Sequence, residues 1–302
     1  MVDKVKEFAM RSDYLNLPLV VIGGPTASGK TSLAIKLAKK FNGEIICADS
    51  RSVYKGMDVG TAKPSKIEQL EVPHWGLDLV EPGEYFSAAD FKNFALTKID
   101  EIRSRGCIPF LVGGTGLYID SIIFDYNFGD KADNNQREKL NKMTIEQLWN
   151  YCSSNNIIMP ENKYNKRYII RNIERNSRDL LRRDVPIDNS IVVAISTDRD
   201  VLRSRIALRI EQLFNDGVVN EAKMLGEMYG WEGEAFKSNA YPPIKQYLSG
   251  LITFDEMRTK MITLDWRLAK RQLTWLRRNK FIHWGSVDDL DLYLNDLLAK
   301  QS

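Results

Sequence analysis

The sequence predicts an α/β protein with a parallel sheet, and three observations lead to this fold class. First, an apolar run ending at Gly23 leads into a Gly-x-x-x-x-Gly-Lys-Thr loop, Gly24–Thr31, and then into a segment of helical spacing, the context of a P-loop. Second, further short apolar runs alternate with helical patterns, which implies a sheet covered on both faces. Third, residues 125–186 are polar and without a good strand, and the chain after Asp198 is almost wholly helical. We therefore expect a P-loop NTPase-like core with a largely helical C-terminal part, residues 1–124 and 187–302, that carries a helical insertion, residues 125–186.

The expected elements follow from the apolar pattern in chain order. Strands are expected over residues 18–23, 44–50, 107–112 and 190–196, and amphipathic helices over residues 32–41, 87–105, 199–215 and 253–278. Pro18 is compatible with the first strand because it stands at that strand's first residue. Ligands of such sheets bind beyond the carboxyl ends of the strands. The glycine loop, the pair Asp49-Ser50 and the stretch Gly113–Gly116 all fall there, so we expect them to share one crevice.

The glycine loop predicts a site for a diphosphate or polyphosphate. Its backbone N–H groups converge on an anion, and the start of the following helix adds to the attraction. Lys30 is expected to reach terminal phosphate oxygens, and the Thr31 hydroxyl to ligate Mg²⁺. The alternative is a tight turn that is rich in glycine for steric reasons alone, but it leaves the Lys-Thr pair without a role.

Bulk composition is that of an ordinary globular protein, with 43% hydrophobic and 27% charged residues. A net charge of +3 is too small to indicate a nucleic-acid partner, so only local clustering of charge can do so. The first 17 residues lack the pattern of a signal peptide, and no apolar run is long enough to span a bilayer, so we expect no membrane partner. Three scattered cysteines suit free thiols in a reducing compartment, and two histidines make a zinc site improbable. These features favour a cytoplasmic location.

Asp49 follows the second expected strand directly, beside the phosphate loop. An aspartate in this position is often a helix N-cap or an indirect magnesium ligand. The functional alternative is a general base within reach of the phosphate site, and the Asp-Ser pair at a strand end beside a P-loop favours it.

Basic residues recur at helical spacing in the insertion, at Arg167, Arg171, Arg175, Arg178 and Arg182. One helix through all five would align them on a single face, with isoleucines and leucines on another. Such a stripe is usually a solvated surface, and Glu174 and nearby acids partly neutralise it. Five arginines nonetheless suggest contact with a nucleic-acid backbone. A second basic helix around Lys270 and Arg271 carries Trp266 and Trp275, which we expect to be core residues.

Several motifs together resemble the tRNA dimethylallyltransferase family, also called the tRNA isopentenyltransferases. The stretches are GPTASGKT (24–31), Asp49-Ser50, YKGMDVGTAKP (54–64), Val72-Pro73-His74, SAADF (87–91), LVGGTGLY (111–118) and KRQLTWLR (270–277). They occur in order over nearly the whole chain. GTAKP and the Arg-Gln-x-Thr-Trp run are specific to that family, whereas the P-loop is shared by many proteins.

The resemblance implies transfer of a dimethylallyl group from dimethylallyl diphosphate to N6 of adenosine 37 in tRNA, with Mg²⁺ present. It implies that Asp49 is the general base on N6. The diphosphate-binding residues that it implies are Gly24, Thr26, Ala27, Ser28, Gly29, Lys30 and Thr31. The residues that it implies on the tRNA side are Ser50, Arg51, Ser52, Thr115, Lys166, Arg167 and Arg171. We expect a monomer with tRNA and dimethylallyl diphosphate as its partners.

The chain departs from the family pattern at three places. The insertion is shorter, with Tyr164-Asn165 in place of an Asp-Pro pair, and Ser52 stands where many members have Gln. After Tyr241 the family usually carries Arg or Lys, which helps to neutralise the diphosphate, and this chain has Pro242 there instead. Because Lys245 lies one helical turn further on, it is a candidate for the missing charge, and a surface lysine without a role is the alternative.

Three other functions stay open on the sequence alone. One is a P-loop kinase for a small molecule, with ATP in the glycine loop. Another is an adenylate prenyltransferase acting on a free nucleotide. The third is a catalytically weakened tRNA-binding paralogue, which the proline at position 242 motivates.

Overall fold

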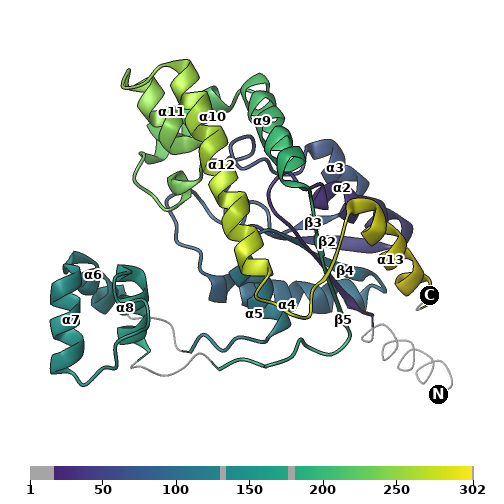
Figure 1. Cartoon of the computed structure of the whole chain (residues 1–302), viewed down its shortest axis with the longest axis horizontal. Coiled ribbons are helices and arrows are strands. Elements are labelled where there is room, and N and C mark those ends of the chain that lie inside the picture. Colours follow the sequence, from purple (N-terminus) through teal and green to yellow (C-terminus); the bar gives the residue numbers. More distant parts are fainter. Residues whose placement is uncertain (1–16, 130–133, 176–180, 301–302) are drawn as a thin grey trace. The chain divides into compact units, whose positions relative to one another are not determined.

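The computed structural model describes residues 17–129, 134–175 and 181–300. The chain divides into two compact units, which Figure 1 draws in sequence colours. Unit 1 comprises Met1–Phe124 and Val185–Ser302, and unit 2 comprises Asp125–Asp184. Each unit is considered by itself below. Residues 1–16, which belong to the segment that lacks a signal-peptide pattern, lie outside the described residues. Arg178 of the predicted arginine stripe also lies outside them.

Unit 1 is built on a six-stranded parallel sheet of order β3-β2-β4-β1-β5-β6. The strands are β1 (Leu19–Gly23), β2 (Gly43–Ala48), β3 (His74–Trp75), β4 (Ile108–Gly113), β5 (Ser190–Ile195) and β6 (His283–Gly285). The four strands expected from the sequence are therefore confirmed, within one or two residues at each end. The edge strands β3 and β6 were not expected, because runs of two and three residues give no readable alternation.

The register of the sheet brings three strand ends together. Gly23 of β1 pairs with Gly113 of β4, and Ala48 of β2 pairs with the same Gly113. The residues that follow these strands, Gly24, Asp49 and Gly114, therefore emerge side by side at one edge of the sheet.

Helices cover the sheet and extend beyond it in Figure 1. They are α2 (Lys30–Lys40), α3 (Lys66–Glu71), α4 (Ala88–Ser104), α5 (Gly116–Ile123), α9 (Arg199–Asn215), α10 (Val218–Tyr229), α11 (Tyr241–Leu248), α12 (Phe254–Leu276) and α13 (Val287–Ala299), with a 3₁₀ turn η1 (Ala235–Lys237). Several begin at residues that cap their own first turn. Ser87 and Asp90 form a capping box at α4, and Thr253 and Glu256 form another at α12. In the described part of the chain, no helix is long and apolar enough to cross a membrane.

Unit 2 is helical, with α6 (Asn134–Lys142), α7 (Ile145–Ser154) and α8 (Lys166–Glu174) packed around a small apolar core. Ile169, Ile170 and Ile173 form the buried side of α8. The expectation of one helix through all five arginines is wrong. Helix α8 ends at Glu174, Arg175 is its C-cap, and Arg182 lies in a segment that is not helical.

Candidate active site

A cleft of about 410 Å³ opens at the carboxyl ends of the strands of unit 1. Its walls come from the phosphate loop, the segment Asp49–Ser52, the loop 60–64, Thr115, and residues of α9 and α12. The three stretches that the sequence placed in one crevice therefore do meet. Two of the cleft's walls, α9 and α12, were expected only as helices.

The phosphate loop is held in a shape that exposes its amides. Gly29 adopts a φ of 94°, which favours glycine, directly before helix α2 begins at Lys30. Lys30 donates to the carbonyl oxygen of Pro25 at 3.2 Å and lines the cleft. Desolvation lowers the pKa of Lys30 from 10.5 to about 8; Asp49 opposes this shift, and Arg209 adds to it. The loop therefore presents a desolvated ammonium that an anion would stabilise.

Arg209 is a cleft residue that the sequence analysis did not single out. It lies on α9, one turn after Arg205, and its Nη1 donates to the Thr26 hydroxyl. Arg205 donates to the Ser28 carbonyl oxygen at 3.4 Å. The Nε of Arg209 and the hydroxyl of Ser28 are buried and lack a hydrogen-bond partner among the described residues. Because unpaired buried polar groups are costly, this end of the cleft is built for a polar ligand. The sequence feature that could have indicated Arg209 is its spacing of four from Arg205 within the helix expected over residues 199–215.

Helix α12 closes the back of the phosphate loop. Gln272 accepts a hydrogen bond from the Thr26 amide at 2.8 Å. This approach depends on Gly114, where a Cβ would lie 2.2 Å from the Gln272 amide nitrogen. Gly116 is equally necessary, because a Cβ there would meet the ring of Trp275 at 2.0 Å. The glycine stretch after β4 therefore packs closely against Gln272 and Trp275 of α12.

Asp49 is oriented by its own local backbone. Its Oδ1 accepts a hydrogen bond from the Arg51 amide at 2.8 Å, so the carboxylate forms a short turn and caps no helix. Thr115 also lines the cleft, and its hydroxyl accepts a hydrogen bond from the Ser50 amide at 3.0 Å. Arg51 extends to the carbonyl oxygen of Glu234 at 2.6 Å. A fixed carboxylate and a hydroxyl therefore share the cleft with the phosphate loop.

The loop 57–64 forms another wall and is anchored from two sides. Glu221 of α10 accepts hydrogen bonds from the Asp58, Val59 and Gly60 amides at 2.6–2.8 Å. From within the loop, Lys63 forms ion pairs with Asp58 and Asp78 at 2.7 and 2.5 Å. The specific GTAKP stretch thus has a structural reason, because its lysine fixes the loop that lines the cleft.

The residues present fit a magnesium ion that is completed by a ligand. No group of three or more His, Cys, Asp or Glu side chains that could hold a metal occurs within the described ranges. Thr31, whose hydroxyl is the expected protein ligand, lines the cleft beside the desolvated Lys30. Mg²⁺ commonly takes few protein oxygens and completes its shell with phosphate and water.

The remaining expected site residues divide between the two units. Ser52 is buried and lines the cleft of unit 1. Lys166, Arg167 and Arg171 belong to unit 2. Lys166 donates to the Asn141 carbonyl oxygen at 2.7 Å, and Arg171 is held by partners inside the unit. Arg167 is exposed on α8.

The charge hypothesis for Lys245 is not supported by its position. Pro242 and Pro243 do occupy the first turn of α11, as expected. However, Lys245 pairs with Glu232 at 2.9 Å and is not among the residues that line the cleft. Arg209 supplies a cation at the phosphate loop instead.

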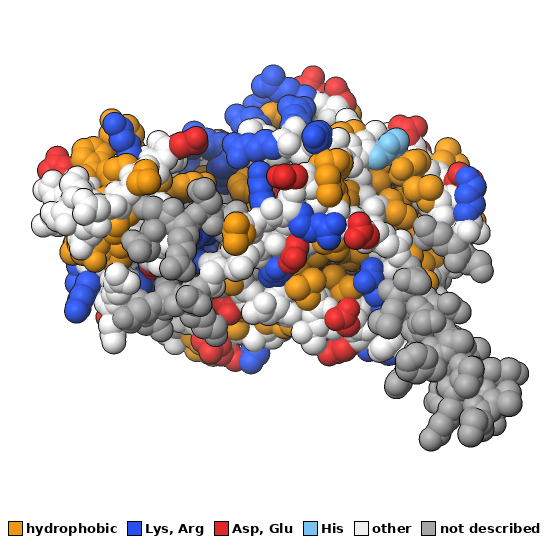
Figure 2. Space-filling view, turned by 90° about the horizontal axis from the view of Figure 1, so that it is seen from below, with side chains coloured by type: hydrophobic (Ala, Val, Ile, Leu, Met, Phe, Trp, Pro, Cys, Tyr) orange, Lys and Arg blue, Asp and Glu red, His pale blue; other side chains and the backbone are white. Residues whose placement is uncertain are grey.

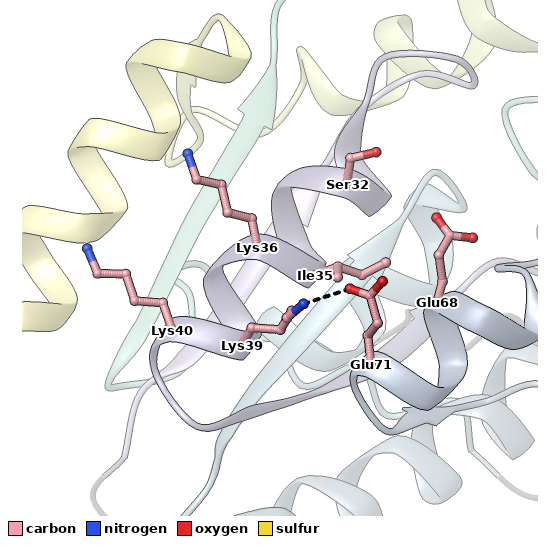
Figure 3. Close-up of a pocket in the computed structure, with 7 residues that line it drawn as sticks. All are labelled: Ser32, Ile35, Lys36, Lys39, Lys40, Glu68 and Glu71. Carbon is pink, nitrogen blue, oxygen red and sulfur yellow. Dashed lines mark hydrogen bonds and ion pairs between the residues drawn. The ribbon is translucent and has the colours of Figure 1, made fainter.

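Two other surface features add no second site. A shallow hollow between α2 and α3 contains Lys39, which pairs with Glu71 at 2.9 Å (Figure 3). Its other lysines, Lys36 and Lys40, extend toward α13, where they meet Asp291 and Asn295. In Figure 2 basic and acidic side chains alternate over much of the face, with a denser group of Lys and Arg at the upper edge.

The parallel sheet, the glycine loop and the cleft at the strand ends define a P-loop-like α/β protein whose cleft is suited to a phosphorylated ligand. The family model described as IPP transferase matches residues 52–279, and the model described as isopentenyl transferase matches residues 17–74. The chain therefore belongs to the tRNA dimethylallyltransferase family.

Individual relatives agree with this assignment. The tRNA dimethylallyltransferase of Halalkalibacterium halodurans is 37% identical over 90% of this chain and 92% of its own, and that of Acetivibrio thermocellus is 38% identical over 90% and 93%. Among solved structures, the full-length tRNA isopentenylpyrophosphate transferase of Bacillus halodurans has a TM-score of 0.72 at 35% identity, covering 94% of this chain and 96% of its own. A eukaryotic dimethylallyltransferase acting on tRNA has a TM-score of 0.75 at 22% identity, over 90% of this chain and 74% of its own, which shows a shared fold.

Proposed function

We propose that this protein transfers a dimethylallyl group from dimethylallyl diphosphate to N6 of adenosine 37 in tRNA. One observation carries the proposal: the cleft places a phosphate loop with two cations, Lys30 and Arg209, beside the fixed carboxylate of Asp49. The family to which the chain belongs supports the choice of reaction.

The phosphate loop holds the leaving group in this proposal. The C1–O bond of the donor breaks, and the diphosphate gains negative charge. Loop amides, Lys30 and Arg209 are arranged around that charge in a desolvated site, where fixed donors are most effective. Thr31 would hold Mg²⁺, which would supply further positive charge to the diphosphate.

Asp49 takes the proton of the acceptor. The N6 lone pair is delocalised into the adenine ring, so nitrogen attacks C1 efficiently only if a base removes a proton as the bond forms. The Arg51 amide engages Oδ1 of Asp49 and leaves the other oxygen for N6–H. The Thr115 hydroxyl, whose position is fixed by the Ser50 amide, offers a second polar contact in the cleft.

The residues that we propose to contact tRNA come from both units. The target base must leave the anticodon stack to enter the cleft, as is general for enzymes that act on a base. Ser50, Arg51 and Ser52 would contact the nucleotide in unit 1, and Lys166, Arg167 and Arg171 would contact tRNA from the helical insertion. Lys237 and Arg271 are further exposed cations on the wall of the cleft that could reach phosphates.

A catalytically weakened paralogue is less well supported than an active enzyme. Pro242 motivated that alternative, because it removes a charge that we placed at the diphosphate. The Arg209 guanidinium at the phosphate loop removes the need for that charge. We infer that the enzyme works as a monomer in the cytoplasm, to which its three free cysteines are suited.

The test is direct. The protein is incubated with Mg²⁺, dimethylallyl diphosphate labelled in the prenyl group, and unmodified tRNA, and the tRNA is then digested to nucleosides. Parallel incubations replace the tRNA with adenosine monophosphate, or the prenyl donor with ATP. We expect label in N6-dimethylallyl adenosine when position 37 of the tRNA is adenosine, and no label when guanosine replaces it. Label in free adenosine monophosphate but not in tRNA would support the adenylate prenyltransferase, and phosphate transfer from ATP to a small molecule would support the kinase.

A further inference from the structure

Asp265 is a buried acid in the wall of the cleft to which the reaction gives no role. It lies on α12, is 6% exposed, and lines the same cleft as the phosphate loop. Asn239, from the segment between η1 and α11, donates to its Oδ1 at 2.9 Å. No Lys, Arg or His of the described residues lies within ion-pair distance of this carboxylate, and its second oxygen has no hydrogen-bond donor among them. The second oxygen is not among the enclosed atoms that lack a partner, so it is reached from the cleft, where water or a bound ligand must supply its hydrogen bonds.

The position of Asp265 separates it from the phosphate loop. Gln272 holds the Thr26 amide, and Asp265 precedes Gln272 by two helical turns. Seven residues of α-helix rise about 10 Å, so the acid lies on the same wall but well away from that contact. A carboxylate near the diphosphate would repel it, which agrees with this separation.

The chemistry of Asp265 and Asn239 limits the kinds of ligand group that Asp265 can bind. The dimethylallyl tail is purely apolar and cannot replace the water lost by a carboxylate. The group that completes Asp265 must therefore donate a hydrogen bond. The neighbouring residues point to RNA, because Lys237 precedes Asn239 by two positions and Arg271 lies further along α12, and both cations line the cleft.

We propose that Asp265, held by Asn239, is a specificity residue that accepts a hydrogen bond from the tRNA at the nucleotides around the target adenosine. The donor is either an amino group of a flanking base or a ribose 2′-hydroxyl, since these are the neutral donors that RNA offers there. The hydrogen bond from Asn239 holds one carboxylate oxygen, so it restricts the rotation of the carboxylate and the position of the second oxygen. This inference rests on the proposed transfer to tRNA.

The experiment crosses protein variants with single-atom changes in the RNA. The substrate is an anticodon stem-loop in which one flanking adenosine or guanosine is replaced by purine riboside or inosine, or in which the target or a flanking nucleotide is 2′-deoxy. Single-turnover transfer at subsaturating RNA is measured for the wild type and for Asp265→Asn. This variant keeps the shape and the hydrogen bond to Asn239 but loses the charge. Asp255→Asn, an exposed acid on the same helix, is the matched control.

We expect one of the RNA changes to slow the wild type and the Asp255→Asn control about tenfold or more, the effect of a lost hydrogen bond to a charged group. The same change should slow Asp265→Asn less than about twofold, because the acceptor is already weakened. The RNA change that slows transfer shows whether the base or the ribose supplies the hydrogen-bond donor. If every RNA change has the same effect in wild type and Asp265→Asn, the proposal is wrong although transfer continues.

Two further outcomes are informative. If Asp265→Asn does not fold, the same RNA changes are measured with Asn239→Ala. If they slow Asn239→Ala as much as they slow the wild type, the proposal is wrong. If Asp265→Asn instead shifts the Mg²⁺ concentration needed for tRNA binding and leaves the RNA sensitivities unchanged, the carboxylate acts on a cation and the proposal is also wrong. Absence of transfer by the wild-type protein would contradict the proposed function itself, not only this inference.

Discussion

The cleft of unit 1 and helix α8 of unit 2 both gather basic side chains, but the two regions use them differently. In the cleft, Arg209 Nε and Ser28 Oγ are buried without a partner among the described residues, and Lys30 has a desolvated ammonium. In unit 2, Arg171 and Arg137 both pair with the carboxylate of Glu174, which is 2% exposed. Arg175 is the exception there, because its Nε is buried and has no hydrogen-bond partner in the described part of the chain.

This contrast separates two reasons for a buried charge. Where the protein itself completes the hydrogen bonds, as around Glu174, the charges hold the fold together. Where it leaves them incomplete, as around the phosphate loop, the missing partner is a ligand. Substitutions in the cleft should therefore alter chemistry and leave folding nearly intact, whereas substitutions around Glu174 should do the reverse.

Replacement of Asp49 should have the largest effect. In Asp49→Asn the side-chain oxygen can still accept from the Arg51 amide, so the local turn is kept while the base is lost. We expect single-turnover transfer to fall by about 10²–10⁴, the contribution of a general base, with diphosphate and tRNA binding little changed. Asp49→Ala should lose at least as much. Transfer within a few-fold of the wild type would remove Asp49 from the base role.

Arg209→Gln should come next. The variant loses the cation at the phosphate loop but keeps a polar side chain near the Thr26 hydroxyl. We expect kcat/KM for dimethylallyl diphosphate to fall about tenfold to a hundredfold, as for the loss of one charged donor in a desolvated site. The unfolding temperature should change little.

Two controls sharpen this prediction. Arg203→Gln removes an exposed guanidinium from the same helix and should be nearly silent. Lys245→Ala breaks a surface pair with Glu232 and should also leave transfer within about twofold, since such pairs contribute little. A large loss in Lys245→Ala with a silent Arg209→Gln would restore the lysine as the diphosphate cation.

Much of the cleft could be predicted from the sequence, because its central residues are local to strand ends. The phosphate loop follows β1 and Asp49 follows β2, so the direction of two strands places them together. Arg209 and Gln272 could not be assigned in this way. Each is one polar residue in a long helix, and only the packing of α9 and α12 against the loop gives it a partner.

The insertion was harder to predict for a different reason. A spacing of three and four between arginines suggested one helix through Arg182, but spacing does not show where a helix ends. Helix α8 ends at Glu174, and the exposed stripe becomes an internal network because Arg171 also reaches the Phe128 carbonyl oxygen. Periodicity reports which residues share a face, not which of them find partners inside the unit.

Glu174→Gln should break the internal network of unit 2. The carboxylate accepts two hydrogen bonds from Arg137 at 2.6 Å each and one from Arg171 at 3.1 Å. Loss of its charge removes the carboxylate with which both guanidiniums form ion pairs, and we expect local stability to fall by about 1–3 kcal/mol. Hydrogen exchange of the amides in α6 to α8 should quicken, while exchange in the sheet of unit 1 should not. Glu161→Gln, an exposed acid in the same unit, is the control.

The kinetic consequence of Glu174→Gln distinguishes the two regions. Binding of dimethylallyl diphosphate should be unchanged, and transfer should weaken through a higher KM for tRNA. Equal losses for donor and tRNA would mean that the insertion also shapes the diphosphate site.

Arg167→Gln should have the smallest effect, and it tests whether any basic residue of α8 contacts RNA directly. Arg167 is exposed on the helix, and its neighbour Arg171 is half-buried and contacts Glu174 and the Phe128 carbonyl oxygen. If its guanidinium neutralises one phosphate, the slope of log affinity for tRNA against log salt should become shallower by about one unit, with a few-fold weaker binding at low salt. Donor affinity and the exchange pattern of α8 should stay as in the wild type, which separates loss of a phosphate contact from loss of structure. Lys300→Gln, which removes an exposed charge near the C-terminus, should leave the slope unchanged. An unaltered slope in Arg167→Gln would mean that the exposed part of α8 is only a solvated surface, and that tRNA meets other residues of the protein.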